Sequence, residues 1–339
     1  MPGDGDDVLF RSAGGAMKRA TAVLAAVAFC ALAGGAAAQS YPARPVRILV
    51  GFAAGGPTDV IARIVAQDMT GSLGQSFVVE NRPGANAIIA TEAVARSAPD
   101  GYTLLFSSLS LLVNAILLEG KVHYDPFKDF APVSNAAVLP MVVVTSPETR
   151  INSMQDLIAL ARAKPGELSY ATSGNGGSTH LAGAMLENAT GTKMINVPFK
   201  GNGPALAEVM AGRVTFMFYP IVGIADQVSA RKLRVLAVGT PRPHADFPAV
   251  PTLEQSGLPG FEETAPWVGM LAPAGTPAPA VDRLARDMRK SLAGRETQER
   301  MKALGAVTVA DTPSEFAAFL KKDYERWARV IKTSGVKAE

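Results

Sequence analysis

Cysteine is almost absent from this 339-residue sequence: Cys30 is the one thiol, and it lies in an apolar run near the N-terminus. Thiol nucleophiles and thiolate metal sites are therefore excluded from the rest of the chain. Histidine is scarce too, with three widely spaced positions and no HExxH pair. The charge is mild, 33 basic against 30 acidic residues, without the basic block that nucleic-acid-binding proteins carry. We expect no metal, no cofactor and no nucleic-acid partner.

The first 38 residues are expected to lie outside the folded protein. The stretch MKRATAVLAAVAFCALAGGAAAQS places Lys18 and Arg19 before an apolar run that ends in small residues at Ala36–Ala38. This order is typical of a cleaved secretory signal peptide. A membrane anchor is the alternative, which the weakly apolar, alanine-rich run disfavours. Residues 1–16 fit no signal sequence and are interpreted as an upstream start of translation.

Strand and helix patterns alternate along the remaining chain, which predicts parallel α/β sheets. The run VRILVGF at 46–52 is almost continuously aliphatic, as in a strand buried on both faces. The apolar segment 130–146 contains Pro140, which a central strand does not tolerate, so two strands are expected to meet there. Helices are expected at 58–70, around Ile88 to Val94, and at 153–163, 179–190, 204–211, 221–231, 279–292, 296–304 and 314–333.

About 300 residues exceed the usual single core and favour two lobes. With chain crossings near 139–141 and 264–267, we expect lobe I to comprise 39–140 with 266–339, and lobe II to comprise 141–265. Each lobe is expected to be a mostly parallel sheet flanked by helices. In such sheets ligands bind at the carboxyl ends of the strands, so the loops that follow strands are the candidate sites.

The first such loop is FAAGGPTD at 52–59, between a strand and a helix. Gly55 permits a close backbone approach, and the helix N-terminus offers free N–H donors and partial positive charge to an anion. Asp59 has two readings that stay open: it contributes to the ligand site, or it caps its own helix and pairs with Arg63. The loop is not a nucleotide-type phosphate cradle, because no Gly-Lys-Ser/Thr follows.

The second loop is ATSGNGGSTH at 171–180, where glycines free the backbone and hydroxyls supply neutral donors. This composition suits a carboxylate, although an ordinary flexible loop with a Ser or Thr cap is the alternative. Ser173 and Ser178 are poor candidates for a nucleophile, because no G-x-S-x-G surrounds them and His180 points away from Ser178.

Two further loops complete the set. PFKGNGPA at 198–205 contains Lys200, which offers a cation to the ligand or is simply solvated. FSSLS at 106–110 ends a buried strand with Ser107 and Ser108. The four donor-rich loops are split evenly between the lobes, and no general base or metal cluster lies among them.

In these motifs the chain resembles the Bug/TctC family of periplasmic solute receptors of tripartite tricarboxylate transporters. The matching stretches, in order from Tyr41 to Lys337, are YPARPVRILVGFAAGGPTDVIAR, VVENRPGA, APDGYTLLF, YDPFKDFAPV, LSYATSGNGGSTHLAG, VPFKGNGPALAEVMAGRV, LRVLAVGT, VPTLEQSGLPGF and APAGTP. Each motif alone is unspecific, whereas the ordered set is highly specific.

The resemblance implies a two-lobe, type II Venus-flytrap binding protein with two crossing strands, monomeric, periplasmic and not an enzyme. It implies a small carboxylate ligand (a di- or tricarboxylate or an aromatic acid) and a tripartite tricarboxylate-type permease as partner. The ligand-binding residues expected from the loops and the resemblance together are Phe52, Ala54, Gly55, Thr58, Asp59, Ser107, Ser108, Ser173, Asn175, Gly176, Ser178, Thr179, Lys200, Gly201 and Tyr219.

The chain departs from the family pattern at two places. Tyr219 stands in FMFYP where the family commonly has Asp, and the loss of that acid argues against an amino-acid ligand and favours a ring. Asn86-Ala87 replaces the usual glycine pair after RPGA, which stiffens the turn. Two other functions stay open: a ligand-sensing subunit for a signalling partner, and a periplasmic hydrolase or isomerase using Ser173 or Asp59. The second lacks an oriented base.

Overall fold

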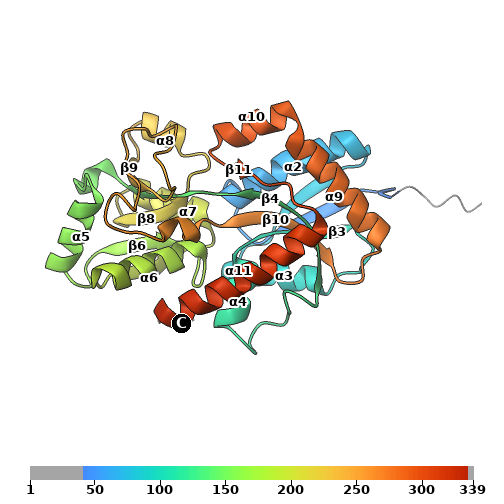
Figure 1. Cartoon of the computed structure of the whole chain (residues 1–339), viewed down its shortest axis with the longest axis horizontal. Helices are drawn as coiled ribbons and strands as arrows, with labels where there is room; N and C mark the ends of the chain where they lie inside the picture. The colour runs from blue at the N-terminus through green and yellow to red at the C-terminus, as the bar shows by residue number, and fades with distance from the viewer. Residues whose placement is uncertain (1–40, 335–339) are drawn as a thin grey trace, which may run out of the picture. The chain divides into compact units, whose positions relative to one another are not determined.

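The computed structural model describes residues 41–334, and its helices and strands belong to one compact unit, Arg44–Glu339 (Figure 1). The predicted signal peptide and upstream extension lie outside the described residues. Among the residues that are described, no helix is long and apolar enough to cross a membrane.

The first sheet has six strands in the order β11-β4-β10-β3-β1-β2. Strand β1 pairs in parallel with both β2 and β3, whereas β10 runs antiparallel to β3 and β4, and β11 antiparallel to β4. Its strands are β1 (Val46–Val50), β2 (Phe77–Asn81), β3 (Thr103–Ser108), β4 (Phe130–Val138), β10 (Trp267–Pro273) and β11 (Val307–Thr308).

The second sheet has five strands in the order β7-β6-β8-β5-β9. Strand β6 is parallel to β7 and β8, and β5 is antiparallel to both β8 and β9. Its strands are β5 (Met141–Thr145), β6 (Ser169–Thr172), β7 (Ile195–Pro198), β8 (Phe216–Pro220) and β9 (Arg234–Val238). The strand break predicted at Pro140 is confirmed, because β4 in one sheet ends just before it and β5 in the other begins just after it.

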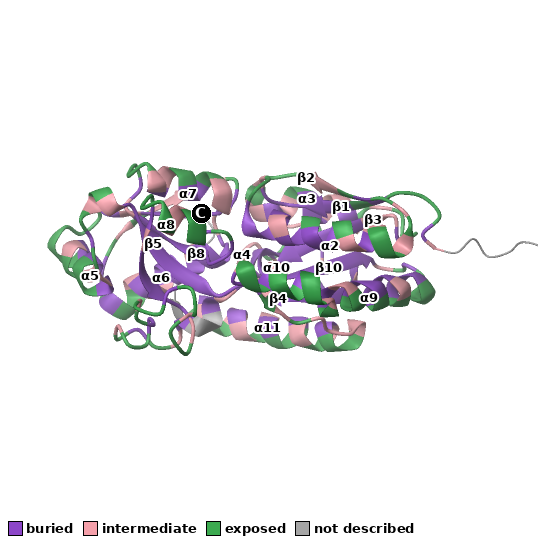
Figure 2. Cartoon of the chain, turned by 90° about the horizontal axis from the view of Figure 1, so that it is seen from above, coloured by how far each residue is buried: buried purple, intermediate pink, exposed green. Residues whose placement is uncertain are grey.

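Helices cover both faces of each sheet, and Figure 2 shows the strands as buried between them. They are α2 (Pro57–Leu73), α3 (Ile88–Ala95), α4 (Ser110–Leu117), α5 (Met154–Ala163), α6 (Ser178–Thr190), α7 (Asn202–Met210), α8 (Ala225–Ser229), α9 (Ala278–Ala293), α10 (Arg295–Ala303) and α11 (Pro313–Ser334). Three short 3-10 turns, Ala85–Ala87, Pro147–Thr149 and Phe261–Thr264, complete the described elements.

Alternation along β5 shows why this sheet is covered on both faces. Met141 and Val143 face one apolar cluster, and Val142 and Val144 face another, as the two-residue period of a strand requires. All four side chains are fully buried. The predicted class, two α/β sheets flanked by helices, is therefore confirmed, with the refinement that β5 and β10 run against their neighbours. The residue boundaries of the two lobes stay a prediction.

Two helices differ from the expectation. Helix α8 is confined to Ala225–Ser229, shorter than the 221–231 expected, and α4 forms where only a strand-end loop was expected. Helix α11 connects the sheets at one place: Trp327 packs with Val113 of α4 and Leu181 of α6 in a single apolar cluster. Helix α6 follows β6 of the second sheet and α4 follows β3 of the first, so this cluster joins helices that belong to both sheets.

Candidate ligand-binding site

Three helices that follow strands begin without a side-chain cap. The N-cap residues of α2, α6 and α7 are Gly56, Gly177 and Gly201, and none of the three helices has a side-chain hydrogen bond at its cap. Helix α5 differs, because Ser153 Oγ accepts a hydrogen bond from Asp156 N at 3.0 Å. The first N–H groups of an uncapped helix have no partner within the helix. Those of α2, α6 and α7 are therefore available to an outside acceptor.

The starts of these three helices converge on one small cavity of about 10 Å³, roughly the space of one water molecule. The first sheet and its helices contribute Phe52, Pro57, Thr58, Asn86, Ser108, Ser110 and Val268. The second sheet and the chain crossings contribute Leu139, Ser173, Gly177, Ser178, Asn202, Pro220 and Pro266. Partial positive charge from three helix N-termini and several hydroxyl donors make this a place for one oxygen atom of an anionic group.

A second cavity of about 700 Å³ shares Asn86 with the small one, and its volume is within the usual range for small-molecule sites. Its lining comprises Gly51, Gly84, Ala85, Asn86, Ala87, Ile88, Asn114, Leu118, Gly174, Asn175, Pro198, Phe199, Lys200 and Pro204. Among the described residues that line the two cavities there is one cation, Lys200, and no Asp or Glu. A carboxylate here would be held mainly by neutral donors.

Loops from the two sheets touch directly beside these cavities. Ala53 N donates to Lys200 O at 3.3 Å. Gly201 has φ +126°, and a Cβ added there would lie 3.2 Å from Ala53 N. The backbone conformation at 201 favours glycine, and the close approach of the other loop leaves little room for a Cβ.

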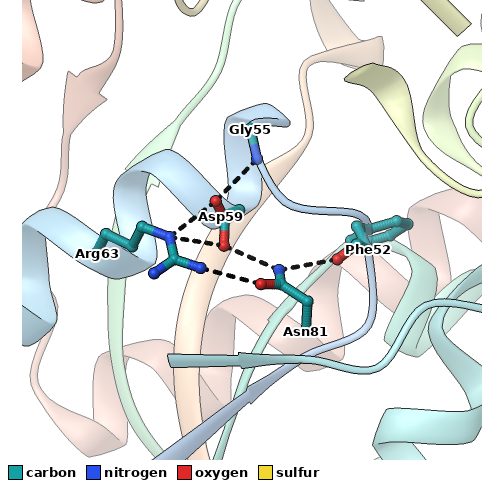
Figure 3. A network of polar contacts seen from close by, with 5 residues as sticks. All are labelled: Phe52, Gly55, Asp59, Arg63 and Asn81. Atoms are coloured by element: carbon teal, nitrogen blue, oxygen red, sulfur yellow. Dashed lines mark hydrogen bonds and ion pairs between the residues drawn. The ribbon is translucent and has the colours of Figure 1, made fainter. Parts of the chain in front are cut away.

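The carboxylate of Asp59 supports the first loop from behind (Figure 3). Its Oδ2 accepts a hydrogen bond from Gly55 N at 2.9 Å, and its Oδ1 accepts one from Asn81 Nδ2 at 2.8 Å. Arg63 Nε donates to both oxygens at 3.0–3.1 Å. The same Asn81 Nδ2 donates to Phe52 O at 3.0 Å, so both ends of the loop are tied to one network.

Asp59 remains charged in this network. Burial by itself would raise the pKa of Asp59, but the hydrogen bonds from Arg63 and the two other donors outweigh burial and lower the pKa below its ordinary value. Of the two readings left open for Asp59, the geometry matches the intramolecular one, because both oxygens are engaged by the chain and the residue lines neither cavity.

The second loop is held by its own side chains. Thr179 Oγ1 accepts a hydrogen bond from Ser173 N at 2.9 Å and lies 3.3 Å from Ser173 Oγ. His180 Nδ1 accepts one from Gly176 N at 3.0 Å. Ser173 Oγ therefore lies beside another hydroxyl rather than a base, which gives the serine-dependent hydrolase no support. Among the described residues, no group of three or more His, Cys, Asp or Glu could hold a metal ion.

The structure brings most of the predicted residues together. Phe52, Thr58, Ser108, Ser173 and Ser178 line the small cavity, and Asn175 and Lys200 line the large one. Ala54, Gly55, Gly176 and Gly201 belong to the same loops without lining either cavity, and Asp59 and Thr179 support those loops from within.

Tyr219 and Ser107 are placed differently. Tyr219 lies in β8, is 3% exposed, packs in the apolar core of the second sheet and has its pKa raised by burial. It lines neither cavity, so the inference drawn from it about the ligand stays a prediction. Ser107 is buried in β3, and its Oγ has no hydrogen-bond partner among the described residues.

Four polar lining residues were not predicted from the sequence: Asn86, Ser110, Asn114 and Asn202. In the sequence Asn86 stands out only as a departure from the family pattern in a turn, and Asn202 belongs to the third loop. Asn114 is a single amide in the apolar run SLLVNAIL, and such an isolated polar residue is a usable signal of a buried hydrogen bond.

Two helix-flanked α/β sheets with uncapped helix N-termini at a common cavity are the arrangement of a solute receptor of the periplasmic binding protein class. The chain belongs to the TctC family, described as tripartite tricarboxylate transporter family receptors, whose model matches residues 61–336. It is 36% identical over 312 residues to protein BugT of Bordetella pertussis, covering 92% of this chain and 95% of BugT. It is 37% identical over 313 residues to a UPF0065 protein encoded in the tcbD-tcbE intergenic region of Pseudomonas sp. strain P51, covering 91% and 93%.

Solved structures of similar proteins share this architecture over most of the chain. The periplasmic binding protein BugD matches with a TM-score of 0.84 at 35% identity, covering 88% of this chain and 100% of BugD. R. palustris Rpa4515 with adipate has a TM-score of 0.84 at 32% identity, covering 88% and 99%. MatC from Rhodopseudomonas palustris with bound malate has a TM-score of 0.81 at 31% identity, covering 86% and 100%. The binding-protein fold inferred from the sequence is thereby confirmed.

Proposed function

We propose that this protein is a periplasmic receptor that captures a small carboxylate between its two lobes and delivers it to a tripartite tricarboxylate-type membrane permease. The observation that carries the proposal is the convergence of the uncapped starts of α2, α6 and α7 on one cavity. Structural relatives bound to adipate and to malate support a carboxylate as the class of ligand. A di- or tricarboxylate or an aromatic acid fits this class.

The proposed mechanism is capture by closure. One carboxylate accepts hydrogen bonds from the first N–H groups of α2 and α6, together with Thr58, Ser173 and Ser178, and the rest of the ligand occupies the larger cavity. Water can bridge these contacts at little cost in free energy. Neutral donors avoid leaving a buried, unpaired cation when the site is empty. The ligand stabilises the closed form because only that form brings both loops to one carboxylate.

Thermal shifts against a panel of acids test the binding step. The panel contains aliphatic di- and tricarboxylates, aromatic acids and acidic amino acids, and the protein is the mature chain from residue 39. We expect a rise in Tm with carboxylates, accompanied by a smaller radius of gyration in small-angle X-ray scattering. Binding without compaction would contradict closure, and the absence of any shift would contradict the carboxylate.

Export and delivery need their own measurements. Mass spectrometry of the protein from the periplasmic fraction should show a mature N-terminus at Gln39. Deleting the gene should abolish uptake of the bound acid by cells that carry the permease. Unchanged uptake would instead favour a role in signalling.

A further inference from the structure

Residues 85–87 form a turn with an unusual backbone. Ala85, Asn86 and Ala87 have φ values of +46°, +49° and +75°, so three consecutive residues other than glycine occupy the left-handed region. Asparagine tolerates this region better than most residues, and glycine tolerates it best. The turn places Asn86 in the lining of both cavities. A side chain kept at such a position points to a role for its functional group.

The orientation of the Asn86 amide is fixed by its neighbour. Asn114 Nδ2 donates to the main-chain oxygen of Asn86 at 2.8 Å, and a main-chain oxygen can only accept. The other end of that amide, Asn114 Oδ1, must therefore be an acceptor, and it receives Asn86 Nδ2 at 2.9 Å. The Asn86 amide nitrogen is therefore engaged by Asn114, and the Asn86 amide oxygen, Oδ1, is an acceptor that this pair leaves unused.

This oxygen has no hydrogen-bond partner among the described residues, although it is buried. It lies against the glycine loop of the second lobe: a Cβ at Gly177 would be 3.2 Å from it, and one at Gly174 would be 3.5 Å from it. A buried acceptor without a partner is unfavourable, because folding has removed its water. Closure of the two loops around a ligand that supplies a donor removes this penalty, whereas closure around a ligand without one retains it.

We propose that Asn86 is a specificity-determining residue whose Oδ1 accepts a hydrogen bond from a hydroxyl group of the ligand, so that the preferred class is hydroxycarboxylic acids. This inference rests on the proposed function, since it assigns a second contact to a ligand already anchored by its carboxylate. A hydroxyl is a better partner than an ammonium group, because the described lining residues include no Asp or Glu to balance a positive charge.

Asn202 provides the matched control. Its Oδ1 is also buried and has no hydrogen-bond partner within residues 41–334, and Asn202 lines the small cavity from α7. In the described part of the chain no amide fixes the orientation of Asn202 as Asn114 fixes that of Asn86, so the Asn202 amide can turn and donate to a carboxylate. Asn202→Ala should weaken acids with and without a hydroxyl alike.

Isothermal titration with pairs of acids that differ by one hydroxyl tests the proposal: succinate with malate, glutarate with 2-hydroxyglutarate, and benzoate with 2-hydroxybenzoate. For the pair that the wild-type protein binds, we expect the hydroxy acid to bind about tenfold tighter. In Asn86→Gly the two affinities should become equal, and in Asn202→Ala the tenfold ratio should persist. Asn114→Leu, which frees the Asn86 amide to turn, should reduce the ratio as a second variant.

Thermal stability separates this role from a merely structural one. Glycine adopts φ +49° without strain, so Asn86→Gly should keep or raise Tm while losing the preference. Equal wild-type affinities within every pair that binds, or a preference retained in Asn86→Gly, would overturn the inference and leave the receptor function intact. If none of the acids bound the wild-type protein, the proposed function would fail and the inference with it.

Discussion

Replacing Asp59 by Asn tests whether the network behind the first loop shapes the site. The substitution keeps the size of the side chain and exchanges one acceptor oxygen for an NH2 group. Whichever way the new amide turns, one of two donors, Gly55 N or Asn81 Nδ2, would face that NH2 group. Rotation of the Asn81 amide would not restore the lost bond, because it would break the hydrogen bond from Asn81 Nδ2 to Phe52 O.

The expected loss follows from these bonds. One hydrogen bond to a charged acceptor disappears, at about 1.5–3 kcal/mol, and the other becomes neutral, at about 0.5–1 kcal/mol. The ion pair with the Arg63 guanidinium is weakened by solvent screening, because the Arg63 side chain is 51% exposed, although the Asp59 side chain is only 3% exposed. We therefore expect Asp59→Asn to lower the free energy of unfolding by about 3 kcal/mol at pH 7, and Arg63→Gln to lower it by less than about 1 kcal/mol.

The pH dependence has a definite sign. The pKa of Asp59 is lower in the folded protein than its ordinary value of 3.8, so its contribution is complete well above pH 3.8 and is lost as the pH falls through the folded-state pKa. The difference between wild type and Asp59→Asn should therefore shrink below about pH 4. Urea denaturation of wild type and Asp59→Asn at pH 7 and at pH 3 measures the loss of stability and its decrease at low pH. A difference under about 0.5 kcal/mol at pH 7, or one that does not shrink at pH 3, would refute the reasoning.

Two pairs of substitutions and one single substitution test other parts of the structure. Gly183→Ala should cost about 3 kcal/mol, because its Cβ would lie 2.3 Å from an aromatic ring, whereas Gly71→Ala in open space should gain about 0.5–1 kcal/mol in urea denaturation. Ala85→Gly should raise the free energy of unfolding by about 1 kcal/mol by relieving its positive φ; a fall would contradict the strain. Leu181→Ala should lower both the free energy of unfolding and the affinity for the carboxylate, because Leu181 lies in the apolar cluster that joins helices of the two sheets. Leu186→Ala should lower the free energy of unfolding alone, because Leu186 packs within the core of the second sheet. Equal affinities of the two variants in isothermal titration would contradict this.

The order of strands and helices was predictable because local sequence patterns indicate most of these elements. Continuous apolar runs identified β1 and β5, and a proline marked the place where the chain passes from one sheet to the other at Pro140. Helix α4 was missed because its run SLLVNAIL follows a strand without a glycine or proline to separate them. The antiparallel direction of β10 depends on its partners β3 and β4, which are distant in sequence.

The site was predictable in part for the same reason. Glycine-rich strand-to-helix loops indicate free helix N-termini, so the sequence pointed to Thr58, Ser173 and Ser178, which line the small cavity; their contact with a ligand stays a prediction. The role that we propose for Asn86 depends on three consecutive left-handed φ values at residues other than glycine and on the distant Asn114, and neither is visible in the local sequence. Whether Asp59 faces a ligand or its own loop likewise depended on Asn81, which belongs to another strand.

A crystal structure of the mature protein with malate would test the central claim most directly. The account predicts one malate carboxylate within hydrogen-bonding distance of the first N–H groups of both α2 and α6, with the rest of the molecule in the larger cavity beside Asn86. Malate bound away from these helix starts, or a carboxylate held by Lys200 alone, would contradict it.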